Sequence, residues 1–438
     1  MGFIHKGQLV RTMVLVSVLV TLLLAFTLST SAEQAEPVKI VYMTPLMDRS
    51  PDRELLLEAK AIFESMHPNI EIELLAAGGE APYAKATTML AGGVQIDVLD
   101  DTESYIPFAN AGMVADLSAF IERDHDVSIE EIIPSALPIF VQEGRLLALP
   151  RLIFATGPVI NRAYFSEAGL PTPDQLGDGW NWDALRNSAR RITRLAADGS
   201  VERYGMLHTP IFQRLTAQMH QAGADLFDRQ LQPTRANLNT PEVREALRFI
   251  AEATQEGIAN RAGIRPFFAD RNAGIHLHAN VNNRTFLEPD DADTFQVVLP
   301  PKGPARGGTE LVFSLYFVLK DTRHPQAAWE WVKFLAFDET FQQMKVRTGI
   351  IPGDVRSLGR LDEYLVGEPS HIAGWVLNFR DVALHPDNFS RYLTPAQSEI
   401  DGIFNPGYLK VLAGEEAVES FLERIQPLVQ TALDRVQQ

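Results

Sequence analysis

Cysteine is missing from this chain of 438 residues, and positively charged residues are few. Without cysteine the chain has no disulfide framework and no zinc–thiolate site, and it offers no thiol for a lipid anchor behind an export signal. Lysine and arginine total 39 against 56 aspartates and glutamates, which gives a formal net charge of −17. No basic run or stripe is present, so we do not expect nucleic-acid binding.

Long apolar runs are also scarce, and the chain contains one, at residues 13–28. Lys6 and Arg11 precede this run without any acidic residue, and the small residues of segment 29–32 follow it. This order is typical of a secretory signal peptide. We therefore expect residues 1–32 to be a signal peptide cleaved after Ala32, and an uncleaved N-terminal membrane anchor is the alternative. No second run is long enough to span a bilayer.

Short catalytic motifs are missing as well. The chain has no G-x-S-x-G, no H-E-x-x-H and no phosphate-binding P-loop. It is longer than a single hydrophobic core usually supports, so we expect two domains.

The hydrophobic pattern after the signal predicts alternating strands and helices. Segment 70–74 alternates apolar and acidic residues, as a half-buried strand does, and segment 54–66 has apolar residues at helical spacing. The predicted order is strand 38–43, helix 54–66, strand 70–74, a helix containing 83–90, and strand 94–99. Such alternation indicates a mostly parallel sheet covered by helices.

A second unit begins near Pro150. Residues 147–150 and 152–161 are predicted to be extended, and residues 302–309 are a Gly/Pro-rich loop. The remaining predicted elements are helices 180–197, 241–256 and 325–337, strands 204–207, 273–277, 295–299 and 311–319, an irregular region 372–404 and a helical tail.

Several segments, taken in order, resemble one protein family. They are "AKAIFESMHPNIEIEL", "LAGGVQIDVLDDTESYIPFANAGMVADLSAFI", "GRLLALPRLIFATGPVINRAYFSEAGLPTP", "NWDALRNSARRIT" and "VLAGEEAVESFLERI". The set is similar to the extracellular solute-binding proteins of family 1, the maltose-binding-like group that delivers sugars to ABC importers. The resemblance covers nearly all of residues 38–438. The chain departs from the family pattern at Ile96-Asp97, where Pro-Asp is usual, and at His278-Ala279-Asn280, where a tryptophan is frequent.

The resemblance implies an α/β protein with the two-lobe periplasmic binding protein fold of type II. Each lobe would be a mostly parallel sheet flanked by helices, with a hinge between them. Lobe one would comprise residues 37–152 and 300–349, and lobe two residues 153–299 and 350–438. The implied function is binding of a sugar or oligosaccharide in the interlobe cleft for an ABC transporter. The implied protein is periplasmic and works with the membrane subunits of that transporter. The sequence gives no sign of oligomerisation, so we expect a monomer, and we expect neither enzymatic activity nor a cofactor or metal.

Ligands of open α/β sheets bind at the carboxyl ends of strands, and sugars need aromatic rings together with groups that satisfy each hydroxyl. In lobe one, the stretch VLDDTESY (98–105) places acids and hydroxyls directly after a predicted strand. We interpret Asp97 and Asp100 as structural, and helix capping is the alternative reading of the other polar residues. The predicted ligand contacts of lobe one are Thr44, Asp48, Glu80, Asp101, Glu103, Ser104 and Tyr105.

The hinge and lobe two supply the other predicted contacts. Arg151 is either a ligand contact or one half of an interlobe salt bridge. His276 and His278 fall on one face of a strand, which is compatible with a metal, although hydrogen bonding is favoured. The predicted contacts here are Arg151, Phe154, Thr209, Phe212, His278, Asn280, the backbone amide of Gly308, and the rings of Trp375 and Tyr392 as stacking platforms.

Other functions compete with sugar binding. A secreted glycosidase would need two carboxylates. Asp101 and Glu103 are only two residues apart on one loop, whereas the working pair normally faces each other from separate elements. The acidic loop also keeps open a polyamine ligand, and the resemblance includes binders of glycerol phosphates. Iron binding is disfavoured because tyrosine is sparse, with nine residues in the chain.

Overall fold

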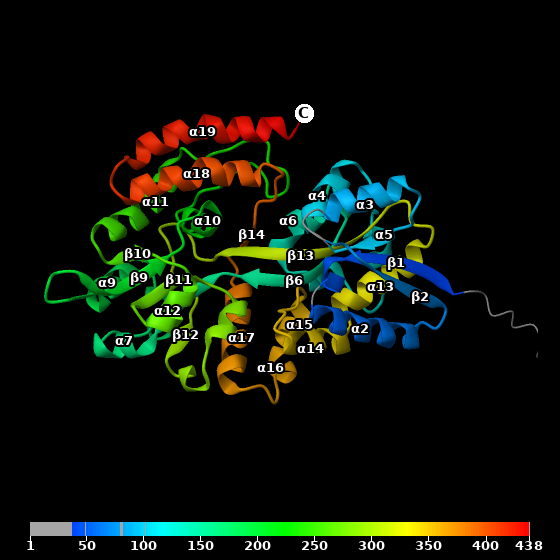
Figure 1. The fold of residues 1–438 in the computed structure, drawn as a ribbon, viewed down its shortest axis with the longest axis horizontal. Helices are drawn as coiled ribbons and strands as arrows, with labels where there is room; N and C mark the ends of the chain where they lie inside the picture. The colour runs from blue at the N-terminus through cyan, green and yellow to red at the C-terminus, as the bar shows by residue number, and fades with distance from the viewer. Residues whose placement is uncertain (1–36, 49, 79–81, 101, 438) are drawn as a thin grey trace, which may run out of the picture.

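A computed structural model describes residues 37–48, 50–78, 82–100 and 102–437. Two groups of helices and strands lie side by side, and two long strands cross the middle between them (Figure 1). The crossing strands are β6 (Leu149–Ala155) and β13 (Glu310–Val318), which pair antiparallel. The chain therefore has the α/β two-lobe architecture expected from its sequence.

The sheet of lobe one has the order β14-β13-β3-β1-β2, with β6 beside β13. β1 (Val38–Thr44) pairs in parallel with β2 (Ile70–Ala76) and β3 (Val98–Leu99). The alternation read from the sequence is confirmed in β2, where Ile70 and Ile72 are buried and Glu71 and Glu73 are exposed. Helices α3 (Pro82–Ala91) and α4 (Thr102–Asn110) lie on one side of this sheet, and α2 (Asp52–Met66) and α14 (Glu339–Arg347) on the other (Figure 1).

The third strand is shorter than predicted, since only Val98 and Leu99 pair in register with β1 and β13. The backbone of Asp97 still hydrogen-bonds to Val41 (2.9 Å) and Leu319 (2.8 Å), and its side chain adds further bonds. Its carboxylate accepts hydrogen bonds from the backbone N–H of Val41 (2.8 Å) and from the hydroxyl of Thr322 (2.6 Å). The side chain is fully buried. The structural role predicted for Asp97 is confirmed, because its carboxylate links the start of β3 to β1 by a hydrogen bond.

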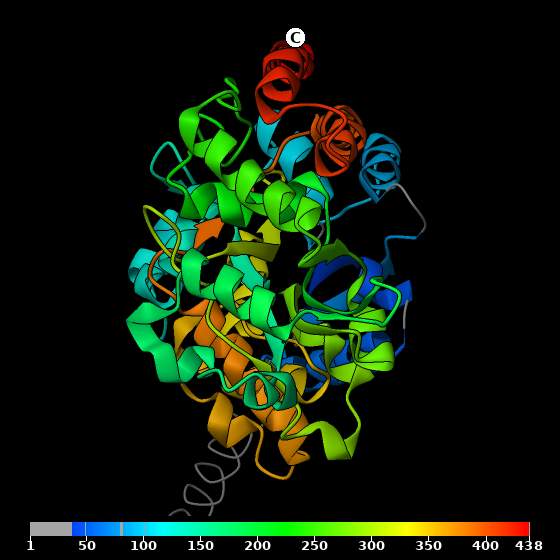
Figure 2. The same ribbon diagram turned by 90° about the vertical axis from the view of Figure 1, so that its left-hand side faces the viewer.

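The sheet of lobe two has the order β10-β9-β11-β7-β12, with β8 beside β9. β9, β10 and β11 are mutually parallel, and β7 runs antiparallel between β11 and β12. The bounds are β7 Gly157–Asn161, β8 Arg194–Leu195, β9 Val201–His208, β10 Ala259–Arg261, β11 Ala273–Ala279 and β12 Phe295–Val297. The covering helices include α9 (Trp182–Ile192), α10 (Phe212–Gln221), α11 (Pro241–Gln255), α18 (Gln397–Leu412) and α19 (Val418–Arg435). Helices α18 and α19 lie at one end of this lobe (Figure 2).

A glycine brings helix α9 onto the lobe-two sheet. A Cβ on Gly205 in β9 would lie 1.9 Å from the carbonyl oxygen of Ala189 in α9, so only glycine fits there. The prediction that this helix continues to residue 197 is wrong. It ends at Ile192, because residues 194–195 leave it to pair with β9 as β8.

The region predicted to be irregular, 372–404, contains regular structure instead. Helix α17 (Ser370–Ala383) occupies its first part, β14 (Phe389–Ser390) its middle, and α18 begins within it. The physical reason lies in the apolar side chains of α17. Trp375, Phe379 and Val382 recur at helical spacing and are buried on one face.

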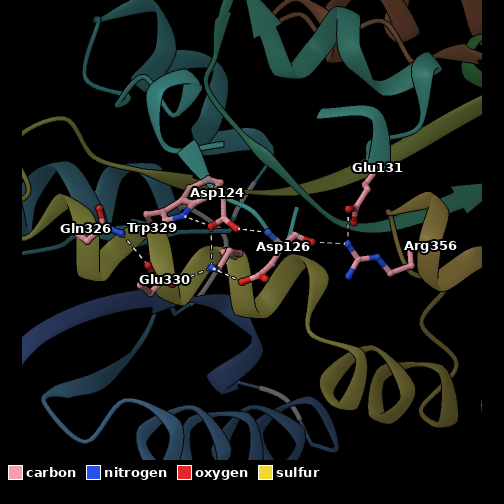
Figure 3. A network of polar contacts seen from close by, with 8 residues as sticks. Asp124, Asp126, Glu131, Gln326, Trp329, Glu330 and Arg356 are labelled. Atoms are coloured by element: carbon pink, nitrogen blue, oxygen red, sulfur yellow. Dashed lines mark hydrogen bonds and ion pairs between the residues drawn. The ribbon is translucent and has the colours of Figure 1, made fainter. Parts of the chain in front are cut away.

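A polar network joins the segment 124–131 to two helices (Figure 3). Asp124 accepts hydrogen bonds from the ammonium group of Lys333 (2.8 Å) and from the indole of Trp329 (3.2 Å), both in α13 (Pro325–Phe337). Arg356, in α15 (Val355–Gly359), donates to the backbone oxygen of Asp126 (2.7 Å) and pairs with Glu131. Helix α15 therefore contacts lobe-one elements, and the lobe boundary predicted between residues 349 and 350 stays a prediction.

Candidate ligand-binding site

The β6–β13 ribbon presents a partly exposed face where it crosses between the lobes. Phe154 pairs with Val312, and Leu152 pairs with Ser314. Side chains alternate across a strand, and the ribbon's other face, with Ile153, Ala155, Leu311 and Phe313, is buried. The side chains of Phe154, Val312 and Ser314 are only half-buried. The ribbon therefore offers an aromatic ring, an aliphatic group and a hydroxyl together.

A bulge in β6 sets the position of Arg151. Leu152 pairs with Ser314 and Pro150 with Leu315, so Arg151 has no residue opposite it. Such an extra residue re-aims its side chain. Arg151 Nε lies 3.4 Å from Asp100 Oδ2, with side chains 9% and 0% exposed. Burial alone lowers the pKa of Arg151, but the facing carboxylate and two tyrosines raise it overall. Arg151 thus forms a salt bridge, but its partner lies within the predicted lobe one and not across the lobes as the alternative to ligand contact expected, and Asp100 has the predicted structural role.

The loops after β1 and β2 are tied together by Asp48. Its carboxylate accepts a hydrogen bond from the backbone N–H of Gly78 (2.8 Å) and is exposed. Thr44 is fully buried at the end of β1, and its hydroxyl accepts from Leu46 N (3.1 Å). Asp48 remains accessible to a ligand, whereas Thr44 supports the turn beneath it.

Three predicted acidic contacts cannot be placed. Glu80 and Asp101 lie outside the described residues, and for Glu103 only the backbone, within α4, is described. They stay predictions.

Two other residues of the VLDDTESY stretch lie inside lobe one. Ser104 and Tyr105 are fully buried in α4. The Tyr105 hydroxyl donates to the backbone oxygen of Ile139 (3.2 Å) and accepts from the amide of Gln142 (3.0 Å). Burial raises the pKa of Tyr105, and its ring packs against Phe317. Tyr105 is therefore a core residue in this structure.

Three histidines lie in the central strands of lobe two, with His208 at the end of β9 and His276 and His278 within β11. Nδ1 of His278 accepts a hydrogen bond from the backbone N–H of Thr209 (3.0 Å), and Nδ1 of His276 accepts from the backbone N–H of His278 (3.1 Å). In both rings the proton therefore resides on Nε2. Burial lowers the pKa of His276 to about 3 and the pKa of His278 well below its usual value. Burial also lowers the pKa of His208 to about 4.

These histidines form hydrogen bonds as neutral rings. Nε2 of His276 pairs with the backbone oxygen of Ala262 (3.2 Å). Within the described ranges, no group of three or more His, Asp or Glu side chains could hold a metal ion.

Two arginines that sequence analysis missed lie on the lobe-two side of the candidate site. Arg391, just after β14, donates two hydrogen bonds to one carboxylate oxygen of Glu310 (2.7 and 2.9 Å). The other oxygen of Glu310 accepts from the hydroxyl of Thr216 (3.0 Å). Arg214 Nη1 donates to the hydroxyl of Thr156 (2.7 Å), in the connection from β6 to β7. By alternation Glu310 and Thr156 share the ribbon face of Val312 and Phe154.

A local signal could have found Arg214. It follows the predicted contact Phe212 by two residues, within the first turn of the helix after β9. Phe212 itself is buried against Phe227 and Phe404. Because Phe212 faces the core, Arg214, two residues further along the helix, points to a different side and can face the ribbon.

The other lobe-two candidates serve the fold. Asn280 caps the short helix η5 (Val281–Phe286) by accepting from Asn282 N (3.0 Å). Gly308 has a φ of +80°, and a Cβ there would lie 2.4 Å from the backbone oxygen of Asp387. The amides that flank Gly308, those of Gly307 and Thr309, donate to Asp387 Oδ2 and Asn388 Oδ1. The loop that was predicted to present amides to a ligand uses these two internally.

The two predicted stacking platforms are core residues. Trp375 is 3% exposed, its indole donates to the backbone oxygen of Val281 (3.1 Å), and its ring packs against Phe379. Tyr392 is 7% exposed and packs against Phe227. Neither ring presents a face to a ligand in this structure, so Phe154 is the half-buried aromatic side chain at the ribbon.

Comparison with protein families gives a match over most of the chain. The model for bacterial extracellular solute-binding proteins matches residues 46–340. Comparison with curated protein sequences gives no significant match.

Solved structures with the same architecture include three whose titles describe binding proteins. The sugar-binding protein MalE from Xanthomonas citri has a TM-score of 0.75 at 16% identity, over 91% of this chain and 98% of that chain. The cyclic α-maltosyl-1,6-maltose binding protein from Arthrobacter globiformis has a TM-score of 0.73 at 16% identity, over 91% and 100%. An ABC substrate-binding protein from Listeria monocytogenes, in complex with cycloalternan, has a TM-score of 0.66 at 19% identity, over 91% and 99%. At these identities the likeness concerns the fold.

Proposed function

The chain belongs to the bacterial extracellular solute-binding proteins, and on that basis we propose that it binds a sugar or oligosaccharide for an ABC importer. The half-buried face of the β6–β13 ribbon is the observation that carries the proposal. Phe154 and Val312 supply apolar surface for a sugar ring, and Ser314 supplies a hydroxyl beside Val312. The described structural relatives include binders of maltose-derived and cyclic oligosaccharides, which supports the same class of ligand.

The proposed site combines the ribbon with polar groups from both lobes. Asp48 would contribute from the loops after the lobe-one strands, together with the undescribed Glu80 and Asp101. Arg214 and His278 would contribute from lobe two, since each sugar hydroxyl buried without a partner costs about 1–3 kcal/mol. Thr209, Asn280 and Glu103 remain proposed contacts.

Binding would close the two lobes on the ligand. The crossing strands β6 and β13 are the connection that a hinge requires, and a ligand that contacts both lobes stabilises the closed arrangement over the open one. The membrane subunits of the importer would then recognise the closed form.

Export and oligomeric state belong to the same proposal. Residues 1–32 would direct the chain to the periplasm and be removed, although this segment lies outside the described residues. In the part of the chain that the structure describes, no helix is long and apolar enough to cross a membrane. The protein would act as a monomer without cofactor, and as a binding protein rather than an enzyme.

A ligand screen tests the proposal directly. The purified mature chain is heated with neutral sugars, acidic sugars, polyamines and glycerol 3-phosphate. A ligand at 100 times its Kd stabilises the folded state by about 2.7 kcal/mol, and calorimetric titration of each hit gives the affinity. Stabilisation by a carbohydrate supports the proposal, and stabilisation by polyamines alone contradicts it. Incubation with labelled oligosaccharides separates binding from hydrolysis, since any turnover favours the glycosidase alternative.

A further inference from the structure

Arg214 is half-buried, and it differs from the other arginines of the site because it forms no ion pair of its own with a described carboxylate. Arg151 faces Asp100, and Arg391 pairs with Glu310. Arg214 donates to the neutral hydroxyl of Thr156, and it forms no ion pair with any carboxylate in the described part of the chain. A guanidinium carries five N–H donors, so most of its capacity is left for a ligand.

The nearest acidic side chain does not fill that role. Burial lowers the pKa of Arg214, the charge of Glu310 raises it in part, and the positive charge of Arg391 lowers it again, so the pKa is lowered overall. Both oxygens of Glu310 already accept hydrogen bonds, one from Arg391 and the other from Thr216. The positive charge of Arg214 is thus partly removed from water without a paired anion, an arrangement that is costly unless a counter-charge arrives.

His278 adds a second donor beside Arg214. Its side chain is 5% exposed, Nδ1 accepts from Thr209, and Nε2 has no hydrogen-bond partner among the described residues. Thr209, whose backbone N–H binds His278, begins the short connection into α10, in whose first turn Arg214 lies, and the positive charge of Arg214 helps to lower the pKa of His278. A neutral imidazole with its proton on Nε2 can donate to an oxygen but cannot neutralise a positive charge.

We propose that the ligand is an acidic carbohydrate, whose carboxylate or phosphate group is bound by Arg214 with Nε2–H of His278 as a further donor. This inference rests on the proposed carbohydrate function and narrows it. A neutral hydroxyl would satisfy one donor and leave the charge of Arg214 unpaired. A carboxylate or phosphate group satisfies the donors and also pairs with the charge, because a guanidinium binds such groups through two parallel hydrogen bonds.

The experiment compares ligands that differ only in charge. Mono- to tetrasaccharides are titrated as the neutral sugar, the uronic acid, the methyl ester of that uronic acid and the 6-phosphate, with glycerol 3-phosphate as an anion without a sugar ring. The wild-type chain is expected to bind an acidic form at least about ten-fold more tightly than its uncharged match, the size of effect that one hydrogen bond to a charged group gives. The uronic acid and 6-phosphate arms distinguish a carboxylate ligand from a phosphate ligand.

Three variants locate the effect. Arg214→Gln should weaken binding of the acidic form at least about ten-fold more than binding of its uncharged match, and Arg214→Lys should keep part of the preference because it keeps the charge. Arg235→Gln removes the same charge from an exposed position of lobe two and should change neither affinity. Thermal melting of each variant confirms that it is folded before titration.

The outcomes separate this inference from the proposed function. Equal binding of acidic and uncharged forms, or an equal loss of both in Arg214→Gln, overturns the acidic-ligand inference and leaves carbohydrate binding intact. If the chain binds glycerol 3-phosphate but none of the carbohydrate forms, the carbohydrate function is overturned. It is also overturned if none of the tested compounds binds.

Discussion

The guanidinium of Arg151 lies 3.4 Å from the carboxylate of Asp100, and both side chains are withdrawn from water. Asp100 ends the strand region of β3 in lobe one, whereas Arg151 belongs to the strand that crosses towards lobe two. Lys345 adds a bond from α14 to the same place, since its ammonium group donates to the backbone oxygen of Arg151 (2.5 Å). This cluster fixes one end of the proposed hinge strand to lobe one.

Asp100→Ala is expected to destabilise the protein by about 3–5 kcal/mol, because it leaves the charge of Arg151 buried without its partner. Denaturant unfolding monitored by tryptophan fluorescence measures the loss. Asp293→Ala is the control. Asp293 Oδ1 lies 3.8 Å from Arg162 Nη1 at the exposed surface, so losing this pair should change the free energy of unfolding by only about 0–1 kcal/mol. The neighbouring Asp101→Ala is expected to weaken ligand binding with stability nearly unchanged. Equal stability of Asp100→Ala and the wild type would contradict the structural role.

Gly308→Ala is expected to destabilise the junction of β13 and β14. The φ of +80° is a left-handed conformation that costs an alanine about 1–2 kcal/mol, and the added Cβ would lie 2.4 Å from the backbone oxygen of Asp387. Gly402→Ala, in α18, is the matched control, since nothing lies within 4 Å of a Cβ there and alanine favours a helix by about 0.8–1.0 kcal/mol over glycine. Thermal melting should show the first variant below the wild type and the second at or above it. The reverse order would contradict the assigned backbone conformation.

Local patterns in the sequence predicted much of the fold. The alternation of segment 70–74 and the apolar stripes of α11 and α13 depend on neighbours a few residues apart, and these elements were placed correctly. The order of several segments indicated the family and hence the two lobes. The prediction of irregular structure for residues 372–404 is wrong, since Trp375, Phe379 and Val382 recur at helical spacing and are buried on one face of α17.

The candidate site was less predictable, because its contacts join residues far apart in the chain. Arg214 and Thr156 are separated by 58 positions, and Arg391 and Glu310 by 81. Nothing local to either residue indicates the pairing. The aim of Arg151 depends on a one-residue bulge, which sequence alternation cannot reveal. Trp375 and Tyr392 are predicted as stacking platforms because they fall in a region predicted to be irregular. Only the packing of the helices and strands around them shows that both rings are buried.

Acid is expected to destabilise the folded chain through the buried histidines. The pKa of His276 is lowered to about 3 by burial, so on acidification the unfolded chain binds a proton that the folded chain does not. The contribution of His276 to stability is fully present above its ordinary pKa near 6.5 and is lost as the pH falls towards 3. Each such histidine makes the free energy of unfolding fall by up to about 1.4 kcal/mol for each pH unit of acidification in this range.

His276→Asn tests that slope, because asparagine keeps an acceptor near the position of Nδ1 without a titrating ring. The free energy of unfolding between pH 6.5 and 4 should depend less steeply on pH in this variant than in the wild type. His125→Asn changes an exposed histidine and should leave the slope unchanged. Equal slopes for His276→Asn and the wild type would show that this ring does not control acid stability.

Ser314→Trp is expected to abolish ligand binding without unfolding the chain. Ser314 is half-buried on the exposed face of the ribbon, opposite Leu152 and beside Val312, so an indole there would occupy the proposed site. Ser398→Trp, at an exposed position of α18, is the control. Calorimetric titration with the best ligand from the screen should show binding for the control alone. Full affinity in Ser314→Trp would place the site elsewhere.

Closure of the lobes can be measured with little background, since the chain has no cysteine of its own. Cysteines introduced at the exposed Glu58 in α2 and Glu245 in α11 carry spin labels on lobe one and lobe two. A ligand that bridges the lobes should shift the distance distribution between these labels towards one narrower population. The pair Glu245→Cys and Ser398→Cys lies within lobe two, so its distribution should not change. A ligand that binds tightly and leaves the first distribution unchanged would contradict hinge closure, because a rigid-body movement about β6 and β13 must alter the separation of the lobes.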